Sequence, residues 1–138
     1  MPETTDEVEA ALAGASSPSW PRRARAGQVL VSHPEVPEAA EALAGLLLDA
    51  GDTAVARRTA EALARVGTVA AVRLVARTLA EADDSHADWI QAGVHDAVAE
   101  ADGVPGIAAV CVRLARDGEA AVRQGAAEIL AWAGGAPH

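Results

Sequence analysis

Apolar residues recur every three or four positions across residues 49–83. This spacing is typical of amphipathic helices, because 3.6 residues per turn bring such positions onto one face. The first stripe is Val55, Thr59, Ala62, Leu63 and Val66, and the second is Val72, Val75, Ala76 and Leu79. Asp52 is a suitable N-cap, and Gly67 suits the left-handed residue that ends a helix. The segment therefore predicts two helices, 52–66 and 68–82, joined by one glycine turn.

The same pattern returns before and after this segment. Adding 35 to both stripes gives apolar residues throughout, namely Ile90, Val94, Ala97, Val98 and Ala101, then Ile107, Val110, Cys111 and Leu114. Adding 67 to the first stripe gives Val122, Ala126, Ile129, Leu130 and Ala133. Upstream, weaker copies read Trp20, Ala24, Gly27, Gln28 and Val31, then Ala40, Leu43, Ala44 and Leu47. A period of about 32 to 35 residues is typical of helical solenoids.

The flanking signals complete the predicted order of elements. Thr4 and Glu7 form a capping box that predicts a short first helix over 6–15. Ser17 followed by Pro18 predicts the start of the next helix, and Ser85 predicts the start of another. The expected helices are then 6–15, 17–32, 37–50, 52–66, 68–82, 85–101, 105–116 and 119–133. We predict an N-terminal capping helix within 1–16, repeats over 17–134 and a flexible tail at 135–138.

The boundaries between repeats resemble the HEAT-repeat family, in the short bacterial form first noted in phycobilisome lyases. The resemblance rests on an aspartate at the turn, an arginine after it, an Ala-Glu-Ala-Leu sequence and a glycine. In the first occurrence the features are Asp49, Arg58, residues 60–63 and Gly67. The pattern returns more weakly between Asp83 and residue 98, and again between Asp117 and residue 134. It implies an all-α fold, an α-solenoid of stacked antiparallel helix pairs with about three and a half repeats. It also implies that the second helix of each pair lines a concave face.

Composition narrows the classes of function. The chain has 138 residues, a net charge of −9 and a pI near 4.8, and all its basic residues are arginine. Such a charge disfavours nucleic-acid binding. No apolar run approaches the ~18 residues of a membrane span, and the acidic N-terminus predicts no signal peptide. The single Cys111 excludes an internal disulfide. We expect a cytoplasmic protein with no membrane partner.

Candidate contact residues lie off the apolar stripes of the second helices. Arginine pairs one turn apart would present donors to carboxylates of a partner, whereas internal pairing with glutamates, such as Arg77 with Glu81, is the alternative. The predicted partner-binding residues are Arg73, Arg77, Arg113, Arg116, Glu41 and Trp89. Trp89 and Trp132 fit either a partial core or exposed anchors, and Trp20 is expected in the core.

Other side chains suggest structural roles. Arg57, Arg58 and Arg123 follow the turn aspartates and are expected to pair with Asp49, Asp52 or Asp117 across repeats. Gly93 and Gly125 lie inside helices, which suggests close helix approach. His95 and Asp96 resemble the His–acid pairs of HEAT-repeat iron hydroxylases, but a single pair cannot hold a metal. Asp84, His86 and Asp88 fit a helix start. Cys111 is expected to be an apolar core residue.

These observations predict a protein–protein interaction or scaffold module that binds a partner on its concave face. We expect no catalytic, cofactor or metal site. The alternatives are a subunit of a HEAT-like lyase or other modifying enzyme, which would need a polar pocket near Trp89, and a nucleic-acid binder. A monomer is favoured, with an oligomer possible if the apolar residues Leu46, Leu48, Leu74 and Val112 are exposed.

Overall fold

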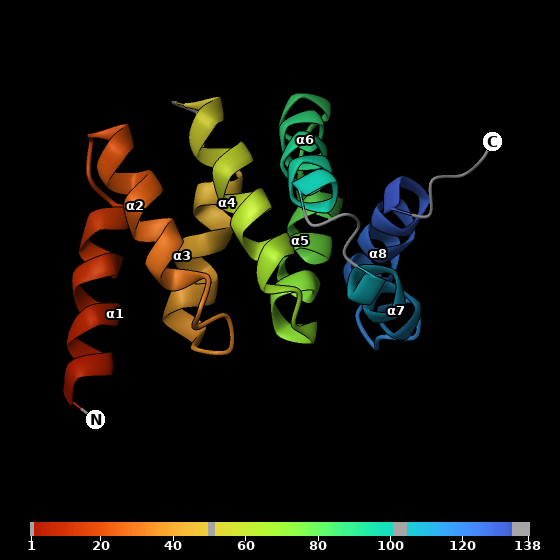
Figure 1. Ribbon diagram of the computed structural model, residues 1–138, viewed down its shortest axis with the longest axis horizontal. Coiled ribbons are helices and arrows are strands. Elements are labelled where there is room, and N and C mark those ends of the chain that lie inside the picture. Colours follow the sequence, from red (N-terminus) through yellow and green to blue (C-terminus); the bar gives the residue numbers. More distant parts are fainter. Residues whose placement is uncertain (1, 50–51, 101–104, 134–138) are drawn as a thin grey trace.

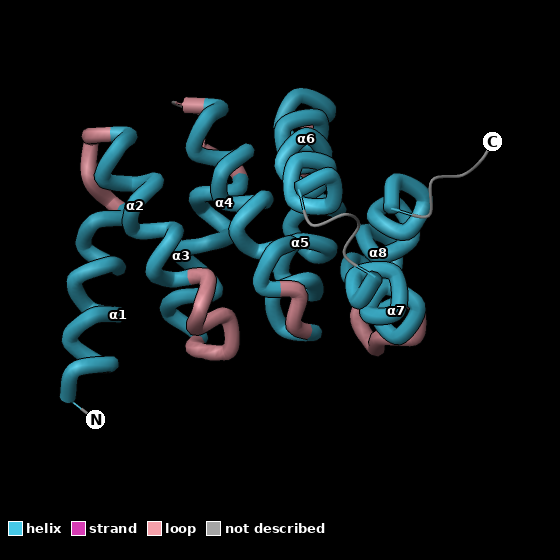
Figure 2. Tube along the Cα trace, viewed as in Figure 1, coloured by secondary structure: helices cyan, strands magenta, loops and turns pink. Residues whose placement is uncertain are grey.

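The computed structural model describes residues 2–49, 52–100 and 105–133, and these residues form α-helices without strands. The helices are α1 Pro2–Ala15, α2 Trp20–Leu30, α3 Pro37–Leu47, α4 Thr53–Val66, α5 Val69–Glu81, α6 Asp84–Glu100, α7 Pro105–Leu114 and α8 Ala120–Ala133. Figure 1 shows them following one another along the long axis of the molecule, from α1 at one end to α7 and α8 at the other. Short turns connect most of them (Figure 2). The predicted tail at 135–138 lies outside the described residues.

Packing between helices follows two series. In one series α4 lies between α2 and α6, and in the other α5 contacts both α3 and α7 (Figure 1). The first helix, α1, packs against α2 and α3 at one end, which is the position expected of a capping helix. The last helix, α8, departs from the series, since it packs mainly against α5 and α7 and only lightly against α6. The described chain is therefore an all-helical arrangement of packed helix pairs.

The reference pair, α4 and α5, forms as the local signals predict. Asp52 Oδ1 accepts a hydrogen bond from the backbone N–H of Ala54 at 2.9 Å, which caps α4. Gly67 ends this helix in the left-handed region at φ 67°, where a side chain would be strained. Thr68 then caps α5 by accepting from the N–H of Ala71. Both predicted stripes are buried except Val66, which is partly buried.

Three of the predicted helix starts are wrong. The first helix, expected over 6–15, begins at Pro2, so Thr4 lies inside α1 rather than at the capping position before it. The other two are the starts of α2 and α6. The helix expected from Ser17 begins instead at Trp20, because Pro21 favours the first turn there and Ser17 Oγ accepts from the N–H of Ser19. The helix expected from Ser85 begins at Asp84, because the carboxylate of Asp83 accepts from the N–H of His86 at 2.8 Å. In both places a second capping residue lay nearby, and the local sequence did not rank the two.

Glycines set how closely three pairs of helices cross. A Cβ at Gly93 of α6 would press on the backbone of α4 at Arg57 and lie 2.8 Å from the Cβ of Ala60. A Cβ at Gly125 of α8 would overlap the backbone of Ala76 in α5. At Gly27 of α2, a Cβ would lie 3.2 Å from Thr59 Oγ1 of α4. The expected close approach at Gly93 and Gly125 is confirmed.

The aliphatic core runs through all eight helices. Its largest fully buried side chains include Leu30, Leu43, Leu63, Ile90 and Ile129. Thr59 is buried too, and its hydroxyl donates to the carbonyl oxygen of Val55 at 2.7 Å, so the polar group costs little. Cys111 is fully buried, and burial raises the pKa of its thiol to about 11, which keeps the thiol protonated at neutral pH. The expectation that Cys111 is a core residue is confirmed.

Candidate functional site

Aspartates spaced 34 residues apart, at 49, 83 and 117, hold the boundaries between the helix pairs. Each accepts a hydrogen bond from a backbone N–H two or three residues later: Asp49 from Asp52, Asp83 from His86 and Asp117 from Glu119. Asp49 and Asp117 also bind an arginine of a neighbouring helix. This repeated arrangement fixes the frame on which the exposed side chains are displayed.

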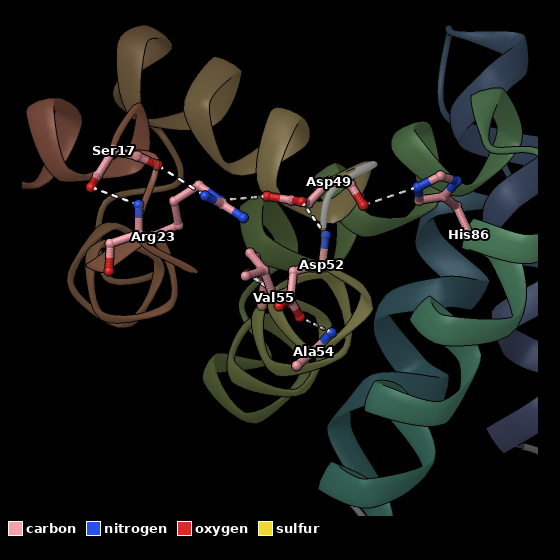
Figure 3. A network of polar contacts seen from close by, with 9 residues as sticks. Ser17, Arg23, Asp49, Asp52, Ala54, Val55 and His86 are labelled. Atoms are coloured by element: carbon pink, nitrogen blue, oxygen red, sulfur yellow. Dashed lines mark hydrogen bonds and ion pairs between the residues drawn. The ribbon is translucent and has the colours of Figure 1, made fainter. Parts of the chain in front are cut away.

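Asp49 joins three parts of the chain (Figure 3). Its carboxylate pairs with Arg23 Nε of α2 at 2.7 Å, and Arg23 Nη1 donates in turn to the carbonyl oxygen of Ser17. The carbonyl oxygen of Asp49 lies 3.1 Å from Nε2 of His86 at the start of α6. Because Arg23 sits on α2, this network fixes that helix relative to the turn that precedes α4.

Two of the predicted contact residues, Arg73 and Arg77, form ion pairs within the protein. Arg73 of α5 binds Asp117 through two nitrogens at 3.1 and 3.3 Å and also reaches Glu119. Arg77 pairs with Glu119 at 3.3 Å, rather than with Glu81 as the alternative interpretation suggested. These two arginines tie α5 to the turn between α7 and α8. The hydrogen bond from Arg73 and the backbone N–H of Glu119 lower the pKa of Asp117.

The other predicted contact residues are not brought together by any ion pair within the described chain. Arg113 and Arg116 are exposed at the end of α7 and just after it, next to Val112, whose side chain is 55% exposed. Glu41 is exposed on α3, and Trp89 is half-buried on α6. Trp132 packs partly against the core and meets His95 edge to face at 6.3 Å between ring centres.

The predicted pairing of arginines with turn aspartates is wrong at two positions. Arg57 instead forms a two-pronged pair with Asp96 of α6, at 2.7 and 3.0 Å, which lowers the pKa of that carboxyl group. Arg58 lies over the ring of Trp20, 5.3 Å from its centre. Arg123 does bind Asp117, but at its backbone carbonyl oxygen. The periodicity placed these arginines beside a turn without indicating which neighbour lay opposite.

Trp20 is the largest departure from the predicted core. Its side chain is 38% exposed, although the weak upstream stripe placed it inside. In α2 the buried face is formed by Ala24, Gly27 and Leu30, while Gln28 is exposed. Trp20 is the first residue of the helix, so its ring lies at the outer edge of the contact with α4 rather than beneath it.

Two neighbouring hollows run along the exposed side of the contact between α2 and α4. One, of about 350 Å³, is lined by Trp20, Pro21, Ala24, Arg25, Gln28 and Arg58. The other, of about 230 Å³, is lined by Gln28, Arg58, Glu61, Ala62 and Arg65. Because they share Gln28 and Arg58, we treat them as one surface and name it the α2–α4 groove. A third hollow, of about 380 Å³, lies between α1 and α2, and its lining combines four alanines with the charged residues Glu7, Arg22 and Arg25.

The chain matches none of the family models, curated proteins or solved structures with which it was compared. Within the described residues, no group of three or more His, Cys, Asp or Glu side chains is placed to hold a metal ion. Among the same residues, no helix is long and apolar enough to cross a membrane. The α2–α4 groove is thus the candidate site with the most distinctive chemistry, an exposed aromatic ring stacked under a guanidinium group.

Sequence reasoning missed this groove for a specific reason. Trp20 falls on an apolar stripe, and Arg58 follows a turn aspartate with which it was expected to pair, so each had an adequate structural explanation. Only the crossing of α2 over α4 shows that the two side chains meet. One signal was available: Gln28 falls at a stripe position, which indicates that the stripe in this helix does not define the buried face.

Proposed function

We propose that this protein is a protein–protein interaction module, a short HEAT-like stack of helix pairs that binds its partner at the α2–α4 groove. The observation that carries the proposal is the exposed pair of Trp20 and Arg58. Tryptophan and arginine are among the residues most enriched in binding hot spots. The indole ring buries a large apolar area, and the planar guanidinium group offers five hydrogen-bond donors in a fixed geometry. An open groove beside them gives a partner side chain a place to enter.

The packing of the helices supports the HEAT-like part of the proposal. Turn aspartates recur every 34 residues, and corresponding helices of successive pairs contact one another. In repeat proteins of this kind each unit buries its apolar face on its neighbours, so the outer surfaces are free to carry the binding residues. The fold class alone would fit many functions, so the argument for binding rests on the groove.

The predicted concave face provides a second candidate binding surface. Arg73 and Arg77 are held by Asp117 and Glu119, so this part of the surface has a structural role. Arg113 and Arg116 beside the exposed Val112 form a smaller patch on α7. The groove is favoured over this patch, because it combines a hollow with an aromatic ring.

Affinity capture from the source organism tests the proposal with two matched variants. Trp20→Ala removes the aromatic ring, and Arg113→Glu alters the patch on α7. Quantitative mass spectrometry should find a partner that the unmodified protein and Arg113→Glu retain at similar levels and that Trp20→Ala loses. A partner lost only from Arg113→Glu would transfer the site to α7. Undiminished capture by both variants would refute binding at either surface.

Crosslinking within the captured complex locates the contact independently. A partner bound in the groove should crosslink to residues of α2 and α4. Circular dichroism and thermal unfolding of Trp20→Ala provide the folding control, because Trp20 is only 38% exposed and the rest of its surface contacts neighbouring residues. Crosslinks confined to α3, α5 and α7 would contradict the groove and support the concave face.

A further inference from the structure

The eleven arginines fall into two groups according to their partners. Six donate to acceptors inside the described chain, namely Arg23, Arg57, Arg65, Arg73, Arg77 and Arg123. The other five, Arg22, Arg25, Arg58, Arg113 and Arg116, form no ion pair with any residue that the structure describes. The chain has 20 acidic residues, so it is notable that these five arginines pair with no carboxylate of the described ranges 2–49, 52–100 and 105–133.

Two of these five arginines line the α2–α4 groove. Arg25 lies on the α2 side and Arg58 on the α4 side, and both are exposed. The groove also contains Arg65 and Glu61, which pair with each other at 2.7 Å. Counting three arginines and one glutamate gives the groove a formal charge of +2, whereas the whole chain carries −9. The groove is therefore a basic site on an acidic molecule, and it attracts carboxylates locally.

The stacking of Arg58 on Trp20 leaves donors available to a partner. A guanidinium group has five N–H donors in a plane, and stacking on a ring uses the face of that plane rather than its edge. Arg58 can therefore remain over Trp20 at 5.3 Å while its edge binds a carboxylate. The aromatic ring fixes the orientation of the donor, which lowers the entropy lost on binding.

The dimensions of the groove limit the length of the partner segment. From Trp20 to Gln28 the α2 side spans eight residues, or about 12 Å at 1.5 Å per residue. An extended peptide covers that length with about four residues. The exposed part of Trp20 offers an apolar surface at one end of the groove. Arg58 lies over the ring there, and Arg25 follows Trp20 by five residues along α2.

We infer that the α2–α4 groove binds a short acidic peptide segment of a partner protein, with an apolar side chain on Trp20 and carboxylates on Arg25 and Arg58. This inference rests on the proposed function and adds the chemistry of the partner. Trp20 and the arginines are also residues on which single-stranded nucleic acid stacks. We favour the peptide, because a continuous chain of phosphates would meet the −9 charge of the molecule far beyond the groove.

Two-dimensional NMR of the full chain tests the inference, with the indole N–H of Trp20 as the reporter. The Trp20→Phe spectrum assigns this signal among the three tryptophans. The main probe is an acetylated and amidated peptide in which one leucine precedes three glutamates. Two further probes are the same peptide with glutamines and an oligothymidylate of matched length. Each is added to the unmodified protein, to Arg25→Glu and to the control Arg113→Glu, which makes the same charge change on α7.

The acidic peptide should shift the Trp20 indole signal and backbone signals of α2 and α4, and added salt should weaken the effect. Arg25→Glu should reduce affinity about tenfold or more, and Arg113→Glu should leave it within about twofold. Equal binding of the glutamine peptide would overturn the charge requirement. Stronger binding of the oligothymidylate at the same signals would replace the peptide with nucleic acid.

Failure of this inference is distinguishable from failure of the proposed function. If no acidic peptide shifts the groove signals but Trp20→Ala still loses a captured partner, the groove binds protein by another chemistry. If the acidic peptide binds and Arg25→Glu abolishes the binding, the chemistry holds whichever partner the organism supplies. Absence of both effects would refute the site.

Discussion

At the scale of single residues, the helix packing depends on glycines that have no side chain and on polar residues that have specific partners. Gly93 and Gly125 lack the Cβ atom that would separate α6 from α4 and α8 from α5. Polar residues at the boundaries have equally specific partners. His86 places Nδ1 2.9 Å from the carboxylate of Asp83 and Nε2 3.1 Å from the carbonyl oxygen of Asp49.

Gly93→Ala and Gly125→Ala should each destabilise the fold by about 2 kcal/mol or more, because the new methyl group meets backbone atoms that cannot move independently. Gly45→Ala is the matched control. A Cβ there meets nothing within 4 Å, on an exposed position inside α3, so the substitution should stabilise by about 0.5–1 kcal/mol. Chemical denaturation measures all three, and a Gly125→Ala variant as stable as Gly45→Ala would contradict the close packing.

The stability of the protein should fall as pH rises from the ordinary histidine pKa of 6.5 through the raised pKa of folded His86. The hydrogen bond to Asp83, followed by that to the backbone of Asp49, raises the pKa of His86 above its ordinary value of 6.5. A raised folded-state pKa contributes stability that is fully present below the unfolded pKa and is lost as pH passes through the folded one.

Urea unfolding between about pH 5.5 and about pH 8.5 measures this loss. His86→Gln should remove most of the decline in this range. His95→Gln, on an exposed position of the same helix, serves as the control. An unchanged pH dependence in His86→Gln would show that the contact with Asp83 and Asp49 does not govern it.

At the scale of secondary structure, the residue at which a helix begins depends on which of several neighbouring polar residues caps its first turn. Asp52 caps α4 as predicted, and Thr68 caps α5 by accepting from the N–H of Ala71. Near α6, Asp83 and Ser85 were both suitable, and Asp83 provides the cap because its carboxylate reaches the N–H and the ring of His86. The choice matters for the boundary between the second and third helix pairs.

Alanine substitution should distinguish Asp52, which caps α4, from Ser85, which was predicted to cap α6 but does not. Asp52→Ala removes an observed side-chain hydrogen bond to the first turn of α4 and should cost about 1 kcal/mol of stability. Ser85→Ala should be close to neutral, since Ser85 is exposed and is not the cap of α6. Thermal unfolding of both variants gives the comparison, and an equal loss in Ser85→Ala would restore the serine as the capping residue.

At the scale of the whole molecule, the aliphatic side chains that would form an oligomer interface are largely inside the protein. Leu46 and Leu74 are buried at 3% and 8% exposure, and Leu48 is half-buried. Among large apolar side chains of the described residues, only Trp20 and Val112 are exposed. Two isolated positions fall well short of the area that a stable dimer interface requires.

Light scattering after size exclusion should therefore give a mass close to 14.0 kDa. Val112→Glu should leave that mass unchanged, because no subunit contact depends on this side chain. A mass near twice the monomer value that returns to the monomer in Val112→Glu would overturn the prediction and identify α7 as the dimer interface.

The sequence by itself determined the number and order of the helices, the glycine turn at Gly67 and most of the buried stripes. These features depend on interactions within a few residues, namely helical periodicity, capping and backbone conformation. It also marked the aspartates at the boundaries. It could not rank two adjacent caps, since their local energies are similar.

Only the tertiary structure decided which side chains meet across helices. Periodicity gives the angle of a residue around its own axis, but not which helix lies opposite or how far along it the contact falls. Arg73 therefore pairs with Asp117, 44 residues away, a contact that its place on its own helix does not predict. For the same reason Trp20 lies at the edge of the crossing with α4 and stacks under Arg58, where the sequence placed it in the core.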